Sequence, residues 1–118
     1  MTLPQPIAWT PEGIRILDQT LLPQDERYLT LDTIAGMAEA ISLLRVRGAP
    51  LIGIAGAYGV ALAARQAGGA TLGLWEALAA VERAAAELVV TRPTAVNLRW
   101  AIERMLAVAR AATGDAPA

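Results

Sequence analysis

The chain has 118 residues, a formal net charge of −1 and a hydrophobic content of 55%, and it contains neither His nor Cys. That length suits one domain with one modest core. The missing residue types exclude a thiolate nucleophile, an imidazole base and an ordinary zinc site, so we expect no metal and no cofactor. The ten basic residues, all Arg, are spread without a cluster, which argues against a nucleic-acid partner.

The first 31 residues predict a small antiparallel sheet. Three short runs of β-type residues, 7–9, 13–17 and 27–31, are separated by turn-forming residues at 10–13 and 22–25. The N-terminal stretch has neither the basic start nor the apolar core of a signal peptide, which predicts a cytoplasmic protein.

From Asp32 onward the hydrophobic period becomes helical and predicts four helices over residues 32–112. Thr30 or Asp32 is expected to cap the first helix, Pro50 to begin the second and Thr71 to cap the third, and residues 91–94 are expected to start the fourth. The positions predicted to face the core are Ile34, Met37, Ala38, Ile41, Leu44, Leu74, Leu78, Val81, Ala85, Leu88, Ala95, Leu98, Ile102, Met105 or Leu106, and Ala109. The predicted fold class is α+β, a three-stranded antiparallel N-terminal sheet (1–31) followed by a four-helix bundle, with a linker-like tail at 113–118.

The stretch RVRGAPLIGIAGAYGVALAAR, residues 45–65, admits three interpretations. Its uncharged run is barely long enough for a membrane span and is rich in Ala and Gly, which contribute little to insertion. Its G-x-x-G-x-x-G spacing matches neither the dinucleotide fingerprint nor the Walker loop. We favour a buried central helix. Its three interior glycines cost about 2–3 kcal/mol relative to alanine, which close packing along two small-residue surfaces would offset. Those surfaces are Ala49, Gly53, Ala57 and Ala61, and beside them Gly56, Gly59 and Ala63.

The start of that helix, Arg47-Gly48-Ala49-Pro50, suits an anion. A helix N-terminus offers unpaired N–H groups and the positive end of the helix dipole, and a guanidinium matches phosphate geometry. The alternative is that Arg47 pairs with a carboxylate such as Asp18.

Arg92-Pro93-Thr94 repeats the design at a second helix start. If the second and fourth helices lie side by side, Arg47 and Arg92 could converge on one dianion. The alternative is that Thr91 or Thr94 only caps the helix and Arg92 is solvated.

Three motifs occur in order over nearly the whole chain: LDQTLLP at 17–23, RGAPLIG with AYG at 47–59, and TRPTAVNL at 91–98. Together they resemble the signature of the methylthioribose-1-phosphate isomerase family. Its superfamily also holds ribose-1,5-bisphosphate isomerases and the regulatory subunits of translation initiation factor 2B. The resemblance implies the N-terminal part of an aldose–ketose isomerase of methionine salvage, with Arg47, Gly48, Ala49 and Arg92 contacting a sugar-phosphate substrate.

The resemblance also implies that the chemistry lies elsewhere. Family enzymes are about three times this length, and their catalytic Cys and Asp lie in a following Rossmann-like domain. We therefore expect residues 1–112 to be the N-terminal helical domain, with the C-terminal catalytic domain absent and no catalytic residue in this chain. On this basis the chain alone is inactive, and the full-length enzyme is a homodimer without nucleic-acid or membrane partners. The alternative is a non-catalytic interaction module like the translation-factor subunits.

Overall fold

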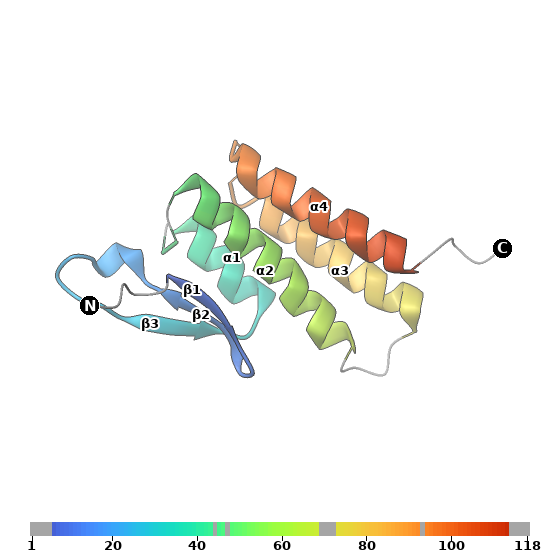
Figure 1. Cartoon of the computed structure of the whole chain (residues 1–118), viewed down its shortest axis with the longest axis horizontal. Coiled ribbons are helices and arrows are strands. Elements are labelled where there is room, and N and C mark those ends of the chain that lie inside the picture. Colours follow the sequence, from blue (N-terminus) through green and yellow to red (C-terminus); the bar gives the residue numbers. More distant parts are fainter. Residues whose placement is uncertain (1–5, 44, 47, 69–72, 93, 114–118) are drawn as a thin grey trace.

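The computed structural model describes residues 6–43, 45, 46, 48–68, 73–92 and 94–113. The predicted α+β class is confirmed, because a three-stranded antiparallel sheet precedes four helices (Figure 1). The elements are β1 (Ile7–Thr10), β2 (Gly13–Leu17), the 3₁₀ helix η1 (Gln19–Leu21), β3 (Tyr28–Leu31), α1 (Ile34–Ser42), α2 (Ala49–Gly68), α3 (Leu74–Val89) and α4 (Val96–Thr113). Figure 1 shows α2 in the middle, between the sheet with α1 on one side and the α3–α4 pair on the other.

The sheet is a meander in the order β1-β2-β3. In the central strand Ile14 and Ile16 are fully buried while Arg15 between them is exposed, which is the alternation expected of a strand with one covered face. The β1–β2 turn depends on Gly13, whose φ of +152° and close approach to the Leu31 carbonyl leave no room for a side chain.

Helix α1 begins at Ile34, later than either predicted cap would place its start. Its N-cap is Thr33, whose hydroxyl accepts a hydrogen bond from the Gly36 N–H at 2.9 Å, so the prediction of Thr30 or Asp32 is wrong. Thr30 still belongs to β3, and only Thr33 directly precedes the first helical turn.

The close-packed central helix is confirmed in α2. A Cβ added at Gly56 would collide with Leu98 of α4, and one added at Gly59 would lie 2.7 Å from Leu88 Cδ1 of α3 and 3.3 Å from Met37 Cγ of α1. The glycines therefore let three helices approach one, which offsets their helix-propensity cost. Over the described ranges, no helix combines the length and apolarity that crossing a membrane requires.

The ends of α3 and α4 differ from the prediction. Gly73 is the N-cap of α3 and makes no side-chain capping bond, whereas Thr71 lies outside the described residues. Leu74, predicted to face the core, is 60% exposed, because it occupies the first turn of α3, beyond the helices that pack against it. Thr91 does not cap α4; its hydroxyl donates to the Leu88 carbonyl at 2.6 Å and so closes the end of α3.

The sheet is attached to the far end of α2 by Arg65. Its Nη1 donates to the Thr10 carbonyl at 3.0 Å, and its Cζ lies 4.3 Å from the centroid of the Trp9 ring. Trp9 in turn meets the Tyr58 ring edge-on, with the centroids 6.0 Å apart. These contacts fix the sheet to the helices at the end of α2 opposite Gly48.

Candidate functional site

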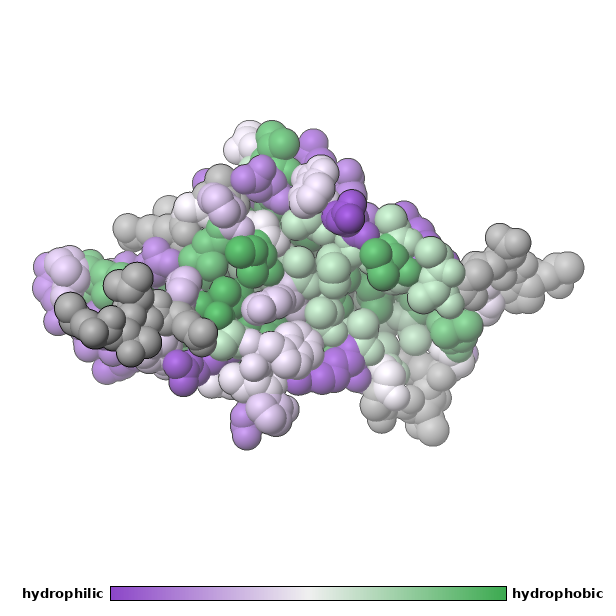
Figure 2. All heavy atoms as spheres, in the orientation of Figure 1, coloured by the Kyte–Doolittle hydropathy of each residue, from purple (hydrophilic) through white to green (hydrophobic). Residues whose placement is uncertain are grey.

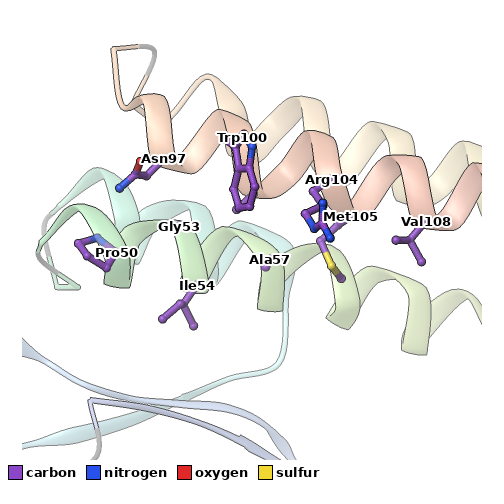
Figure 3. A pocket seen from close by; sticks show the side chains of 10 residues that line it. Pro50, Gly53, Ile54, Ala57, Asn97, Trp100, Arg104, Met105 and Val108 are labelled. Atoms are coloured by element: carbon purple, nitrogen blue, oxygen red, sulfur yellow. The ribbon is translucent and has the colours of Figure 1, made fainter.

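The N-terminal ends of α2 and α4 lie side by side. A Cβ added at Gly53, in the first turns of α2, would lie 3.1 Å from the carbonyl oxygen of Asn97, the second residue of α4. Figure 3 shows Pro50, Gly53 and Asn97 together at this end of the helix pair. The backbone that leads into α2 and the backbone that leads into α4 are therefore at the same end of the bundle, as the idea of a shared anion site requires.

Gly48 gives this end an open stretch of backbone. Its φ is +91°, a conformation that residues with side chains rarely adopt, and an added Cβ would meet nothing within 4 Å. The Gly48 carbonyl accepts the Ile52 N–H at 2.9 Å, and Ala49 is the first residue of α2. A ligand can therefore reach the N–H groups of the first turn, which have no partner within the helix. Arg47 lies outside the described residues.

Arg92 lies between α3 and α4 and is half-buried, so it is not simply a solvated side chain. Its carbonyl accepts the Ala95 N–H at 2.9 Å, in the turn that starts α4. Its Nη1 is buried and has no hydrogen-bond partner among the described residues. A buried guanidinium nitrogen without an acceptor is uncommon and costs free energy, so this atom has an unused capacity to donate to an anion.

The predicted alternative partner of Arg47 is already engaged. Asp18 is 2% exposed, and its Oδ2 accepts from Arg45 Nη1 at 2.5 Å. Its Oδ1 accepts from the Thr20 hydroxyl at 2.6 Å and from the Thr20 N–H at 3.0 Å. The partner that the structure shows for Asp18 is Arg45, because the chain turns so that Arg45 faces the end of β2; Arg47, the suggested partner, lies outside the described residues.

This network keeps Asp18 ionised. Burial by itself would raise the pKa of Asp18, but the hydrogen bonds from Thr20 and the neighbouring Arg45 guanidinium outweigh burial and hold that pKa below its ordinary value. Asp18 and Thr20 lie in the 17–23 motif, which was the one signal for them in the sequence, and nothing in the sequence distinguished Arg45 from Arg47 as the partner.

An apolar groove of about 450 Å³ runs from this end along α2 and α4. Figure 3 shows Ile54 of α2 and Trp100, Met105 and Val108 of α4 along it, with Arg104 beside Trp100. Trp100 is 61% exposed and Val108 63%, which is unusual for two large apolar side chains along one helix. In Figure 2 apolar residues gather across the middle of this view of the molecule, between more hydrophilic regions.

At this end of the bundle the described residues offer hydrogen-bond donors of a kind that suits an anion. The whole chain lacks His and Cys, and no group of three or more Asp and Glu side chains comes together within the described ranges. The features at this end are an open helix start and a buried guanidinium nitrogen, groups of the kind that hold and orient an anion in proteins.

Comparison with known proteins finds relatives that match most of the chain. The model of the initiation factor 2 subunit family (IF-2B) matches residues 45–117. A methylthioribose-1-phosphate isomerase from Methylococcus capsulatus is 52% identical over 111 residues, which are 94% of this chain and 31% of that protein. The chain therefore spans about a third of the length of the curated relatives it matches.

Two solved structures share the fold. The 5-methylthioribose 1-phosphate isomerase from Pyrococcus horikoshii superimposes with a TM-score of 0.87 at 34% identity, over 97% of this chain and 32% of that one. The delta subunit of translation initiation factor eIF-2B from A. fulgidus gives a TM-score of 0.80 at 42% identity, over 86% of this chain and 29% of that one. Because the family model matches more than half of the residues, the chain belongs to the initiation factor 2 subunit family.

Proposed function

We propose that this chain is the N-terminal, substrate-binding part of an aldose–ketose isomerase that converts 5-methylthioribose 1-phosphate into 5-methylthioribulose 1-phosphate. The observation that carries the proposal is the 52% identity, over 94% of the chain, to a protein named methylthioribose-1-phosphate isomerase. Participation in methionine salvage and a cytoplasmic location are predictions of the same proposal.

The substrate-binding groups in this proposal are Arg47, Gly48, Ala49 and Arg92. The phosphate would accept hydrogen bonds from the N–H groups at the start of α2 and from the unpaired Nη1 of Arg92. Two observations support this arrangement: the open backbone at Gly48 and the adjacency of the α2 and α4 starts at Gly53 and Asn97.

The proton transfer would come from the part of the enzyme that this chain does not contain. Phosphate on the anomeric carbon keeps the sugar ring closed, so isomerisation needs a positioned acid–base pair in a site that excludes water. This chain supplies anion contacts and an apolar wall, which are positioning elements, so we propose that it is inactive alone.

We propose that the remaining two thirds of such an enzyme cover the groove between α2 and α4. The exposed Trp100 and Val108 would then be buried by the catalytic domain in a full-length homodimer.

The test is to replace the matching segment of the Methylococcus capsulatus relative with residues 1–112 and to measure isomerisation. The chimera should be active, and Arg92→Ala in it should lower kcat/KM by about 10- to 100-fold, the worth of a charge-assisted hydrogen bond to phosphate. Arg83→Ala, which removes an exposed arginine from α3, is the matched control and should leave kcat/KM unchanged. An active chimera that tolerates Arg92→Ala as well as Arg83→Ala would contradict the assignment of Arg92.

The second candidate function is a non-catalytic assembly module. It is favoured by the 42% identity to the eIF-2B delta subunit and by the exposed apolar groove. Sedimentation of the isolated chain with and without a sugar phosphate separates the two. Ligand-independent self-association favours the module, and a monomer that binds sugar phosphate favours the isomerase.

A further inference from the structure

Asp18 stands out because, of the residues that the structure describes, it is the one charged side chain that is buried. It follows the central strand β2 and is the N-cap of η1. Burying a carboxylate is costly unless it is paired and hydrogen-bonded, so this position calls for a structural reason.

Arg45 is held at three points, two of them at Asp18 and Gln19 and one at the end of α1. The carboxylate binds the Arg45 guanidinium at 2.5 Å, the N–H of the next residue, Gln19, donates to the Arg45 carbonyl at 2.8 Å, and the Arg45 N–H donates to the Ala40 carbonyl at 2.9 Å. Thr20 holds the carboxylate in place from the other side through its hydroxyl and its N–H. The end of β2 and the end of α1 thereby fix both the backbone and the side chain of Arg45.

Arg45 is three residues before Gly48, and Val46 between them is fully buried. The Gly48 carbonyl then accepts the Ile52 N–H and starts α2. A hydrogen-bonded residue, Arg45, and a buried residue, Val46, therefore precede the open Gly48 backbone closely in the chain.

We propose that Asp18 and Thr20 are positioning residues that set the backbone at Gly48 for ligand binding without touching the ligand. The inference rests on the proposed function, in which Gly48 contacts the sugar phosphate. It gives the 17–23 motif a role: η1 clamps the strand-to-helix connection. A main-chain anion site needs its N–H groups held within a fraction of an ångström, so loss of the clamp should weaken binding even in a folded protein.

The test compares Asp18→Asn with Asp25→Asn in the 118-residue chain. Asp25 is exposed, and its ion pair with Arg27, at 3.8 Å, is long and exposed to solvent. Its substitution therefore makes the same charge change but leaves the contacts of Asp18 with Arg45 intact. Both substitutions remove one negative charge, which by itself would strengthen phosphate binding. We expect Asp18→Asn to raise the dissociation constant for ribose 1-phosphate at least tenfold, and Thr20→Val to raise it by less, whereas Asp25→Asn leaves it unchanged or lowers it slightly.

A second readout is independent of the ligand. Amide hydrogen exchange of Gln19 and Ile52 should accelerate at least tenfold in Asp18→Asn relative to Asp25→Asn, whereas exchange of Leu88 in the core should change only as much as the global free energy of unfolding does. Arg65→Met controls for general loss of stability, because its contacts are at the opposite end of α2. Equal exchange at Gln19 and Ile52 in both Asp variants would overturn the clamp. Failure of the unmodified chain to bind ribose 1-phosphate would count against the proposed function, and the exchange rates alone would then decide whether Asp18 fixes the connection.

Discussion

Substituting Gly59 by alanine tests the close packing of α2 most sharply. The added methyl group would start 2.7 Å from Leu88 Cδ1 and 3.3 Å from Met37 Cγ, and both of these side chains are fully buried. Forcing a carbon into a filled core costs about 1–3 kcal/mol, whereas replacing glycine by alanine within a helix gains about 1 kcal/mol. We therefore expect Gly59→Ala to lower the free energy of unfolding by about 0–2 kcal/mol.

Gly68→Ala is the matched control, because it is the same substitution at the last residue of α2, where an added Cβ would meet nothing within 4 Å. It should raise the free energy of unfolding by about 0.5–1 kcal/mol. Urea unfolding followed by circular dichroism should separate the two variants by about 0.5–3 kcal/mol, which corresponds to roughly 2–12 °C in Tm. If Gly59→Ala proves as stable as Gly68→Ala, the glycines are not needed for helix approach and the packing argument fails.

Three further substitutions test the polar contacts. Asp18→Asn should lower the free energy of unfolding by about 3 kcal/mol. This value is near the lower end for breaking a buried ion pair, because the Arg45 side chain is partly exposed. The folded pKa of Asp18 lies below its ordinary value, so this stabilisation is complete above the unfolded pKa and is lost as pH falls through the folded one. The difference in the free energy of unfolding between wild type and Asp18→Asn, measured with urea, should thus stay constant above about pH 5 and become smaller below about pH 4. A difference that does not depend on pH would contradict the pairing. Arg92→Met should raise the free energy of unfolding by about 1 kcal/mol in phosphate-free buffer, because it removes a buried unpaired nitrogen; a loss of stability would mean that Arg92 already has a partner. Arg65→Met should lower the free energy of unfolding by about 1–2 kcal/mol, because it removes the contacts with Thr10 and Trp9. Arg110→Met should lower it by less than about 1 kcal/mol, because the ion pair of Arg110 with Glu82 is exposed. Equal costs for these two would refute the anchoring role of Arg65.

The strands and helices were predictable because their signals are local. In the run from Gly13 to Leu17 the exposed Arg15 lies between two buried isoleucines, and the helical period marks core residues such as Met37 and Ile102. Capping was less predictable, because Thr30, Asp32 and Thr33 are all acceptable N-caps and only the end of β3 decides among them.

The candidate site was predictable only in part. The open start of α2 follows from Gly48 and Pro50, whose conformational preferences are local. The choice of Arg45 over Arg47 as the partner of Asp18 was not accessible, because two arginines two residues apart differ only through the path of the chain between α1 and α2. Likewise, the burial of Arg92 Nη1 depends on how α3 and α4 meet, which periodicity does not encode.

The central claim is that the starts of α2 and α4 together bind the phosphate of the sugar substrate. It is tested most directly by titrating the ¹⁵N-labelled chain with 5-methylthioribose 1-phosphate and following its amide and arginine side-chain resonances. The account predicts saturable shifts concentrated at residues 48–52 and 92–97, and their loss in Arg92→Ala. Shifts confined to other parts of the chain, or equal shifts in Arg92→Ala, would contradict it.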